Sequence, residues 1–410
     1  MTQLSLFKVF ITIVMVWVLT NATSVSAQIA VSESVLTHHN NVRRTGVYDH
    51  ETRLTPAGIA EKRPTFARFE RLCIRKVDGQ IAAQPLYVKN VNIGGTLKNV
   101  LYVVTRNDTI YAFDADNINS NDPKQGSAWA NPIALKHTIS ANRSVSAGPL
   151  KGMDEARAPG EPLCLQTHGP VGITSTPVID PSSQIMYLVA RFGPKPQEPD
   201  YGSTAYYFLI SLDIRTGQEL RRTQIGTGTP ESLATNPCPD TGFNACAELN
   251  RPGLLLLNNV IYIAFGAAVC DNAHSRGWVF AYSVPDMTQL DAYNTSPQSW
   301  GAGIWQSGAG LAADPARQLI YAFTGNNGDA DWIAAQQTGE SPNRDDVYHP
   351  SRTELGQSLL KLRLGPDRKF SCDHKVGKYC VPEHFTAGNW YRLDTGYHSP
   401  SERQQRGSPT

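Results

Sequence analysis

Four side chains with binding chemistry stand just before apolar, strand-like runs of the sequence. They are His168, Arg251 and the adjacent pair Trp305-Gln306. An imidazole, a guanidinium, an indole and an amide can hold a ligand by hydrogen bonds, charge and stacking. Positions where repeated strands begin converge at one mouth of a closed β structure, where ligands usually bind. We therefore treat these four as candidate mouth residues, with capping and packing between sheets as the alternative role.

Oxygen-bearing side chains gather at two other places, but neither has the spacing of a known metal loop. The first cluster comprises Asp114, Asp116, Asn117, Asn119, Asn121 and Asp122, and the second Asp329 and Asp331. Carboxylate and amide oxygens are the ligands that Ca²⁺ prefers, yet the ordered spacing and glycine of a calcium loop are absent. Solvated turns are the favoured interpretation, and we predict no metal ligand.

Catalytic signatures are also missing from the sequence. Gly308 follows Ser307, but no G-x-S-x-G motif occurs and no histidine is placed as a triad partner. The cysteines contain no C-x-x-C and no C-x-x-C-H, so zinc-type spacing and covalent haem attachment are excluded. We predict no catalytic residue.

The first 27 residues have the pattern of an export signal. Lys8 is followed by an apolar run over 9–19, and Val25-Ser26-Ala27 places small residues at the −3 and −1 positions. The run of about eleven residues is shorter than the roughly 20 needed to span a bilayer. We expect an exported protein, secreted, periplasmic or at the cell surface, with no stable membrane span after cleavage.

Seven cysteines are compatible with an oxidising compartment. Cys238 and Cys246 are eight residues apart, as are Cys372 and Cys380, so two local disulfides are plausible, and at least one thiol must stay free. The charges balance at 37 basic against 36 acidic residues, which argues against a protein built to bind nucleic acid.

The rest of the chain consists of short β-type runs that repeat as a unit. High glycine and proline contents, 33 and 27 residues in 410, favour an all-β fold. The predicted strands fall in four units: 85–88, 100–104 and 110–113; 172–179, 185–190 and 206–213; 254–257, 260–265 and 278–282; 307–311, 319–324 and 358–362. An earlier run, 66–77, alternates apolar and charged residues and predicts one further strand.

The turns and tyrosines of these units recur in register. Two units turn at near copies, DPSSQ (180–184) and DPARQ (314–318), and a third turns at Asn258-Asn259, a pair that tolerates the positive φ of a primed hairpin turn. The tyrosines at equivalent places are Tyr102, Tyr187, Tyr262 and Tyr321. Repeated antiparallel meanders that need neighbours to bury their faces predict a β-propeller of four-stranded blades, with a β-sandwich of hairpins as the alternative.

Several phrases resemble the secreted pyrroloquinoline quinone (PQQ) repeat-like β-propeller proteins, a quinoprotein-type family. They are AAQPLYVKNV, NVLYVVTRNDTIYAFDADN, GITSTPVIDPSSQIMYLVAR, RPGLLLLNNVIYIAFG and GIWQSGAGLAADPARQLIYAFTGN, spread over about residues 35–395. In this family a tryptophan after the blade's A-x-D segment docks between blades. Ala112-Phe113-Asp114 followed by Trp129 is a stretched version of that motif. The resemblance implies PQQ and Ca²⁺ as possible cofactors, although the vicinal disulfide of many such enzymes is absent.

From these observations we expect a signal peptide (1–27), an N-terminal segment leading into the fold (28–65) whose polar residues 36–56 lie at the surface, a PQQ-like propeller (66–395) and a disordered tail (396–410). Four units plus the run at 66–77 predict about four to five blades, fewer than the seven or eight of a closed ring in this family, so we expect an incomplete propeller. The favoured function is a non-catalytic binding or structural module for a small molecule, glycan or protein. The alternatives are a PQQ- and Ca²⁺-dependent dehydrogenase of alcohols or sugars, and a carbohydrate-binding surface propeller.

Overall fold

The protein was analysed as a computed structural model. The structure describes residues 33–49, 73–117, 128–129, 133–134, 150–151, 170–193, 205–226, 242–245, 247–267, 275–297, 300–325, 327–328, 355–371, 374–376 and 379–386. The predicted signal peptide, the tail and His168 lie outside these residues, as do Cys238, Cys246 and Cys372. Of Cys380 the structure describes only the backbone, so the predicted disulfides stay predictions. Within the described residues no helix is long and apolar enough to cross a membrane.

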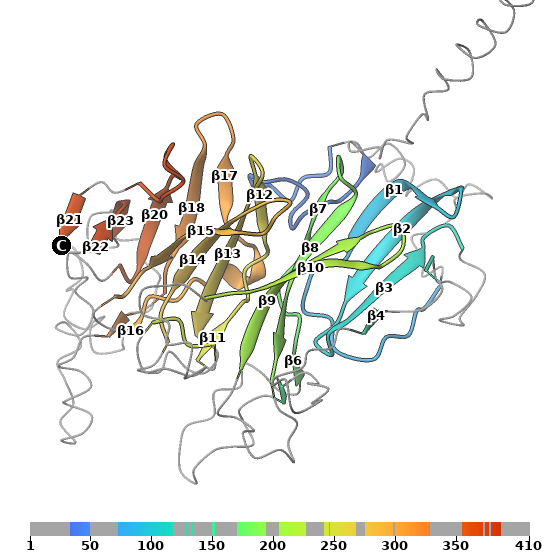
Figure 1. The fold of residues 1–410 in the computed structure, drawn as a ribbon, viewed down its shortest axis with the longest axis horizontal. Helices are drawn as coiled ribbons and strands as arrows, with labels where there is room; N and C mark the ends of the chain where they lie inside the picture. Colours follow the sequence, from blue (N-terminus) through green and yellow to red (C-terminus); the bar gives the residue numbers. More distant parts are fainter. Residues whose placement is uncertain are drawn as a thin grey trace, which may run out of the picture.

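Four antiparallel sheets, which we call blades 1 to 4, make up the fold (Figure 1). Blade 1 contains β1 (Leu86–Ile93), β2 (Thr96–Val104), β3 (Thr109–Asp114) and β4 (Ile133–Ala134). Blade 2 contains β7 (Val178–Asp180), β8 (Ile185–Phe192), β9 (Tyr206–Asp213) and β10 (Glu219–Gln224). Blade 3 contains β12 (Leu255–Leu257), β13 (Val260–Ala267), β14 (Trp278–Ser283) and β15 (Gln289–Asn294), and the two-residue strand β11 (Glu248–Leu249) pairs with the far end of β13 as an addition to these four. Blade 4 contains β17 (Ala312–Asp314), β18 (Leu319–Phe323), β20 (Ser358–Leu362) and β23 (Glu383–Thr386).

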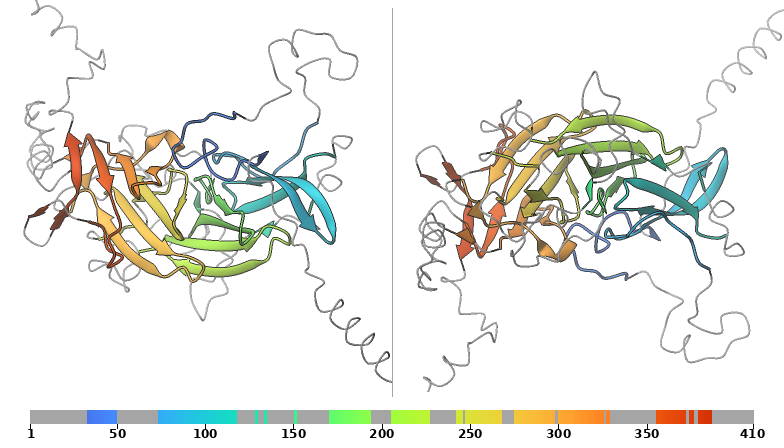
Figure 2. Two further views of the ribbon diagram at one scale, coloured as in Figure 1. Left: turned by 90° about the horizontal axis from the view of Figure 1, so that it is seen from above. Right: turned by 90° about the horizontal axis from the view of Figure 1, so that it is seen from below.

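Three two-stranded pairs and one short helix complete the described elements. The pairs are β5 (Leu150–Lys151) with β6 (Pro170–Val171), β16 (Trp300–Gly301) with β19 (Asn327–Gly328), and β21 (His374–Val376) with β22 (Tyr379–Val381). The helix is the 3₁₀ turn η3 (Gln306–Gly308). The blades lie side by side in chain order, from the first (cyan) at one side to the last (red) at the other (Figure 2). The four-stranded propeller blade predicted from the repeats is therefore confirmed, with four blades among the described residues.

The interior strands of blades 2 and 3 are buried on both faces because these blades pack against two neighbouring blades. On β8, Met186 and Leu188 belong to the core shared with blade 1, whereas Tyr187 and Val189 belong to the core shared with blade 3. Successive side chains of a strand point to opposite faces of the sheet. When both faces are covered by apolar neighbours, the sequence of the strand is therefore a continuous apolar run. This packing explains the unbroken sequence of 185–190, and it holds the blades together without a separate central core.

The repeated tyrosines occupy matching register positions. Each lies on the second strand of its blade, opposite a first-strand residue: Leu86↔Tyr102, Val178↔Tyr187, Leu255↔Tyr262 and Ala312↔Tyr321. The first three of these tyrosines are buried in the core shared with the following blade. The predicted equivalence is confirmed, and its physical reason is the contact with the next blade.

The turn predictions are also confirmed. In the two near-copies, Asp180 accepts the Ser182 amide at 3.0 Å and Asp314 accepts the Ala316 amide at 3.1 Å. Gln184 and Gln318, the last residues of the two motifs, share a positive φ of 57° and 56°. In the third unit Asn258 and Asn259 have φ of 50° and 58°, the left-handed pair of a two-residue primed turn.

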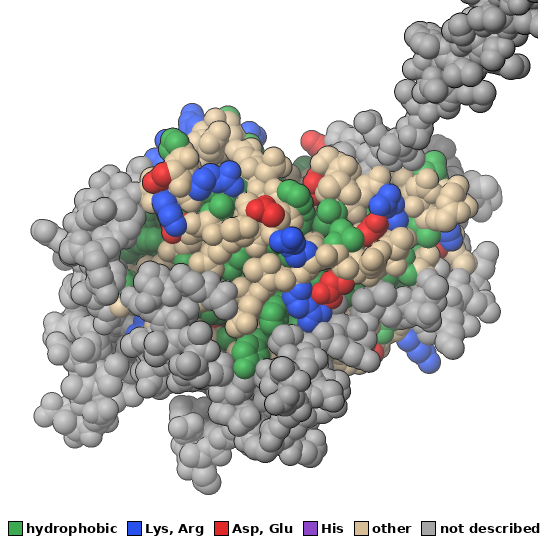
Figure 3. All heavy atoms as spheres, viewed as in Figure 1, with side chains coloured by type: hydrophobic (Ala, Val, Ile, Leu, Met, Phe, Trp, Pro, Cys, Tyr) green, Lys and Arg blue, Asp and Glu red, His purple; other side chains and the backbone are tan. Residues whose placement is uncertain are grey.

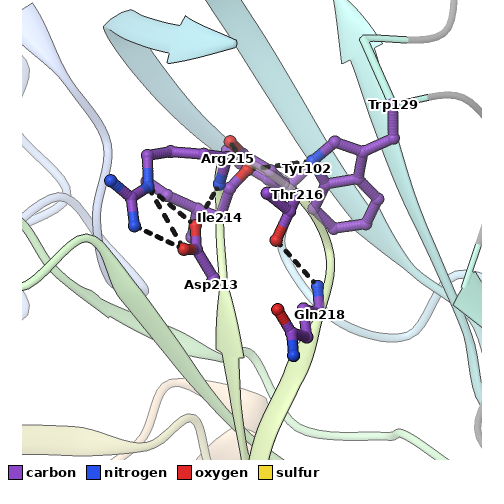
Figure 4. A network of polar contacts seen from close by, with 7 residues as sticks. All are labelled: Tyr102, Trp129, Asp213, Ile214, Arg215, Thr216 and Gln218. Carbon is purple, nitrogen blue, oxygen red and sulfur yellow. Dashed lines mark hydrogen bonds and ion pairs between the residues drawn. The ribbon is translucent and has the colours of Figure 1, made fainter. Parts of the chain in front are cut away.

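Blade 1 docks on blade 2 through two side chains that donate to one carbonyl (Figure 4). The Tyr102 hydroxyl donates to the Ile214 carbonyl at 2.7 Å, and Trp129 Nε1 donates to the same oxygen at 2.9 Å. Trp129 is 5% exposed and its ring lies 5.7 Å from that of Tyr102. The tryptophan expected to dock between blades therefore does so, at the turn that follows β9.

The strand predicted at 66–77 is wrong for the part that the structure describes. Residues 73–77 alternate between half-buried and exposed as expected, but they join no sheet. The Thr105 and Thr109 hydroxyls instead donate to the Asp78 carboxylate, and the Tyr111 hydroxyl accepts the Asp78 amide at 3.0 Å. These side-chain bonds attach the segment to β3 and to the turn before it. The backbone of 73–77 does not pair with a neighbouring strand.

Residues 33–44, which we call the strap, contact the first strands of blades 1, 2 and 4 and the segment directly before β12 of blade 3. Val35 bridges to Tyr87 on β1, the Leu36 carbonyl accepts the Ile179 amide of β7 at 2.9 Å, and the Val42 carbonyl accepts the Ala313 amide of β17 at 2.8 Å. Blade 3 is reached through Arg44, described below. We expected a polar surface segment here, and the structure places it along the line where the first strands gather, with Ser34 and Thr37 buried.

Candidate functional site

The candidate site lies at the end of the blades where the first strands begin. Because neighbouring strands are antiparallel, the segments that precede β7, β12 and β17 share this end with the β2–β3 turn. We call 172–177, 250–254 and 303–311 the approach segments. They touch one another directly: the Leu254 amide donates to the Thr176 carbonyl at 3.0 Å, and the Gly253 amide donates to the Gly308 carbonyl at 3.3 Å.

Close packing of the approach segments depends on two glycines. A Cβ on Gly310 would lie 2.4 Å from the Gly253 carbonyl oxygen, and Gly310 has a φ of 82°. A Cβ on Gly253 would lie 3.1 Å from the Cβ of His38 in the strap. The missing side chains let the strap and the approach segments of blades 3 and 4 meet, which brings their polar side chains into one place.

Arg44 attaches the strap to the approach segments. Its Nε donates to the Leu311 carbonyl at 2.9 Å, its Nη2 to the Leu254 carbonyl at 2.9 Å, and its Nη1 to Thr37 Oγ1 at 2.7 Å and the His38 carbonyl at 2.9 Å. Burial lowers the pKa of Arg44 to about 10, so it remains charged at neutral pH. All its partners are neutral oxygens, so its positive charge is left in the site.

Arg251 projects into the same region from blade 3. A Cβ on Gly308 would lie 3.3 Å from Arg251 Nη1, so the guanidinium rests against the turn that precedes β17. The Arg251 side chain is half-buried, and among the described residues it makes no hydrogen bond or ion pair. Arg106 comes from the β2–β3 turn of blade 1 and is 9% exposed; burial lowers its pKa, and so does the Arg251 guanidinium.

His38 is the remaining titratable member of the site. Burial, His39, Arg44 and Arg251 all lower its pKa, to about 4, against a smaller opposite effect of the Ala309 backbone. Its Nδ1 is buried without a hydrogen-bond partner among the described residues. His38 is therefore neutral at pH 7, in surroundings that are cationic or uncharged.

Trp305 and Gln306, two of the candidate mouth residues, mainly support the backbone. The Trp305 ring lies 3.2 Å from where a Cβ of Gly266 would be and 3.5 Å from that of Gly325. Gln306 Nε2 donates to the Gly310 carbonyl at 2.8 Å and so bridges its own turn. Packing and capping, the alternative role considered for these residues, describes their contacts.

Sequence reasoning identified Arg251 but missed three members of the site. His38 and Arg44 come from a segment expected at the surface, and Arg106 lies in a hairpin turn that carried no motif. The usable signal was the polar sequence 36–44, LTHHNNVRR, whose two histidines and two arginines precede the first blade. Of the predicted residues the structure brings Arg251, Trp305 and Gln306 to one end of the blades, and His168 lies outside the described residues.

A Ca²⁺ ion does not fit the described members of this site. They present cationic and neutral nitrogen groups, whereas Ca²⁺ requires several oxygen ligands including carboxylates. The nearest carboxylate in sequence to Arg106 is Asp108, which is 1% exposed beneath Gly172, and burial raises its pKa well above the usual range. Asp78 is held by the Thr105 and Thr109 hydroxyls. No group of three or more metal-binding side chains occurs among the described residues.

The acidic clusters noted in the sequence form local contacts where they are described. Asp114 pairs with Lys98 at 3.0 Å, and Asp116 accepts the Asn99 side-chain amide at 2.9 Å. Asn117 is also described, whereas Asn119, Asn121, Asp122, Asp329 and Asp331 lie outside the described residues. Cys73, which is half-buried, is a free thiol.

Among solved structures the chain is similar to quinoprotein dehydrogenases. The quinohemoprotein alcohol dehydrogenase of Pseudomonas putida is 12% identical over 87% of this chain and 40% of its own, with a TM-score of 0.43. That of Comamonas testosteroni is 13% identical over 75% and 35%, with a TM-score of 0.37. A europium-containing methanol dehydrogenase is 14% identical over 71% and 41%, with a TM-score of 0.40.

The chain thus spans about two fifths of the length of these enzymes. Likeness at this level carries no argument about function, and the assignment of a β-propeller rests on the blades described above. No family model matches the sequence, and no curated protein matches it.

Proposed function

We propose that this protein is an exported, non-catalytic β-propeller module that binds a ligand at the end where the first strands begin. The observation that supports this function is the convergence of three other segments on Arg251. The strap contributes His38, blade 1 contributes Arg106, and the approach segment of blade 4 lies against the guanidinium through Gly308. Polar residues distant in sequence that converge at one end of a fold are typical of a binding site.

A PQQ- and Ca²⁺-dependent dehydrogenase is the main alternative, since the sequence resembles the PQQ-like family. It is less well supported because the described site lacks the carboxylates that a Ca²⁺ ion needs. A carbohydrate-binding propeller is the third possibility. Sugar recognition commonly uses an exposed aromatic face, whereas the Trp305 indole packs against Gly266 and Gly325.

Two assays on the purified protein separate these functions. In the first, PQQ and Ca²⁺ are added, and quinone absorbance that stays with the protein after gel filtration is measured together with dye reduction by alcohols and sugars. In the second, a small-molecule and glycan library is screened by thermal shift, because a ligand that binds only the folded state raises Tm. Ligand-dependent stabilisation without dye reduction supports the proposal. Dye reduction that depends on PQQ would overturn it in favour of the dehydrogenase.

Export is a further part of the proposal, supported by the sequence of residues 1–27. Expression of the full chain should yield a mature N-terminus at Gln28, detected by mass spectrometry of the exported fraction. Recovery of the intact chain inside the cell only would contradict export.

A further inference from the structure

The Arg251 guanidinium lacks a hydrogen-bond acceptor among the described residues. It is half-buried in the approach segment that precedes β12, it rests against Gly308, and none of the described residues accepts its hydrogen bonds. A guanidinium offers five N–H donors in a planar fork that matches a carboxylate or phosphate. A partly desolvated cation without an acceptor costs free energy, which an anion bound there would recover.

The neighbours of Arg251 add positive charge instead of neutralising it. Arg106 is close enough for the Arg251 charge to lower its pKa, and Arg44 forms its hydrogen bonds with neutral oxygens. The backbone bonds of Arg106 fix the turn that carries it: its amide donates to the Gln80 carbonyl at 2.9 Å, and its carbonyl accepts the Gly172 amide at 2.9 Å. Three arginines from different segments are therefore held near one point by the fold.

Besides the arginines, several polar side chains in this region have buried atoms without partners among the described residues, and two of them can donate a hydrogen bond: His38 Nδ1 once protonated, and the Ser175 hydroxyl. Two others, Asn250 Oδ1 and Gln306 Oε1, are acceptors in the approach segments of blades 3 and 4. Ser175 lies in the approach segment of blade 2, which is bonded to that of blade 3 because Thr174 Oγ1 donates to the Asn250 carbonyl at 2.6 Å. A hydroxyl and an imidazole are suitable additional donors for an oxyanion, since native proteins seldom leave such buried atoms unpaired.

We propose that Arg251, with Arg106 and His38, binds the carboxylate or phosphate group of a small anionic ligand at the end of the blades where the first strands begin. This inference rests on the proposed binding function and names the ligand class. Arg251 supplies the fork that binds two oxygens, and Arg106 supplies a second positive charge. His38 becomes a donor when it takes up a proton, which the anion favours.

Proton uptake by His38 gives the site a recognisable pH dependence. The groups that face His38 are His39, Arg44, Arg251 and the Ala309 backbone, and the cationic ones disfavour a further positive charge. A bound anion offsets this effect, so binding is coupled to protonation. Once the protons that citrate and phosphate themselves take up are accounted for, affinity for the anion should rise as the pH falls from 7.5 towards 5, and the His38→Gln variant should lose this rise.

The test is a calorimetric titration of the whole exported protein with citrate, inorganic phosphate and neutral methyl glucoside, at constant ionic strength in chloride. We expect citrate or phosphate to bind with a Kd in the millimolar range or tighter, and the sugar not to bind. Arg251→Gln should weaken anion binding at least tenfold, which is the loss expected for one charge-assisted pair. Arg363→Gln, which removes an exposed arginine beyond β20, is the matched control and should leave affinity unchanged.

The outcomes separate the ligand class from the binding function. Equal anion affinity in the wild type and Arg251→Gln, or binding of the sugar alone, would overturn the anion site while leaving a binding module. Binding of none of the three probes, together with an empty library screen, would overturn both. Arg251→Gln should also keep or raise Tm, because it removes repulsion from Arg106. A fall in Tm of several degrees would show that Arg251 has a structural role.

Discussion

At the scale of single residues, Arg44 anchors the strap through hydrogen bonds of its guanidinium. Its guanidinium donates to four oxygens that belong to the strap and to the approach segments of blades 3 and 4. Replacement by methionine keeps much of the side-chain volume but leaves these oxygens without a donor. Each buried acceptor that loses its partner costs roughly 1–3 kcal/mol, although water will recover part of this.

We therefore expect Arg44→Met to lower the free energy of unfolding by about 3 kcal/mol. The measurement is urea denaturation followed by intrinsic fluorescence. Arg43→Met, at the exposed neighbouring residue, is the matched control and should change stability by less than about 0.5 kcal/mol. An Arg44 variant as stable as this control would show that the strap is not anchored through Arg44.

His38 predicts a dependence of stability on pH. Its folded-state pKa of about 4 lies below its ordinary value of 6.5, so the unfolded chain takes up a proton first as the pH falls. The contribution of neutral His38 to the free energy of unfolding is fully present above pH 6.5 and is lost progressively between pH 6.5 and 4. Because His38 is partly exposed, the loss should be smaller than a fully buried imidazole would give.

Unfolding free energies measured at pH 7.5, 5.5 and 4 in chloride buffer, without a bound anion, test this prediction. The decline should be smaller in His38→Gln than in the wild type. His39→Gln removes the adjacent, exposed imidazole and should follow the wild type. Parallel curves for the wild type and His38→Gln would contradict the assignment of a neutral, desolvated His38.

At the scale of elements, the β17–β18 turn offers a test of backbone strain. Gln318 is exposed and holds a φ of 56°, a left-handed conformation that glycine adopts without cost. Gln318→Gly should stabilise the protein by up to about 1 kcal/mol, whereas Gln318→Ala keeps the strain and should not. Thermal melts of both variants measure the difference, and an equal effect of the two substitutions would contradict this account of the turn.

The same scale shows how far the sequence predicts this fold. Strands such as β8 and β13 were predictable because both faces are apolar and the flanking turns have Asp-Pro or Asn-Asn chemistry. The unpaired segment 73–77 was not, because alternation specifies which side chains are buried but not whether a backbone partner exists. The short strand β4 lies outside any apolar run, and only pairing with β3 defines it.

The site was harder to predict than the blades for a physical reason. Arg251 stood out because it precedes a strand in a repeated unit. His38, Arg44 and Arg106 act through contacts between segments that are 60 to 270 residues apart, and sequence spacing does not report such contacts. Trp305 and Gln306 also precede a strand in a repeated unit, as Arg251 does. In the structure, however, Trp305 packs on glycines and Gln306 donates to a carbonyl of its own turn.

At the scale of the whole molecule, blades are joined by shared cores and by docking side chains. The Ile214 carbonyl accepts from both Tyr102 and Trp129, so either donor alone keeps it satisfied (Figure 4). Tyr102→Phe should cost about 1 kcal/mol, and Trp129→Phe about 2 kcal/mol because the ring is also smaller. The double variant should cost about 1 kcal/mol more than the sum, since it leaves the carbonyl unpaired. Strictly additive losses in denaturant titrations would contradict the shared docking.

On the face that Figure 3 shows, basic and acidic side chains lie interspersed over the described part, which fits the balanced total of 37 and 36 charges. Ion pairs such as Arg317 with Asp314, at 2.7 Å, are exposed and contribute little stability.

Hydrogen exchange with and without citrate tests the central claim most directly, namely that a ligand binds where the strap meets the approach segments. We expect citrate to slow amide exchange in 35–44, 250–254 and 303–311, and to leave the outer strands β10 and β15 unchanged. The Arg251→Gln variant should show no such protection. Protection confined to the outer strands, or none at a citrate concentration that saturates binding, would contradict the account.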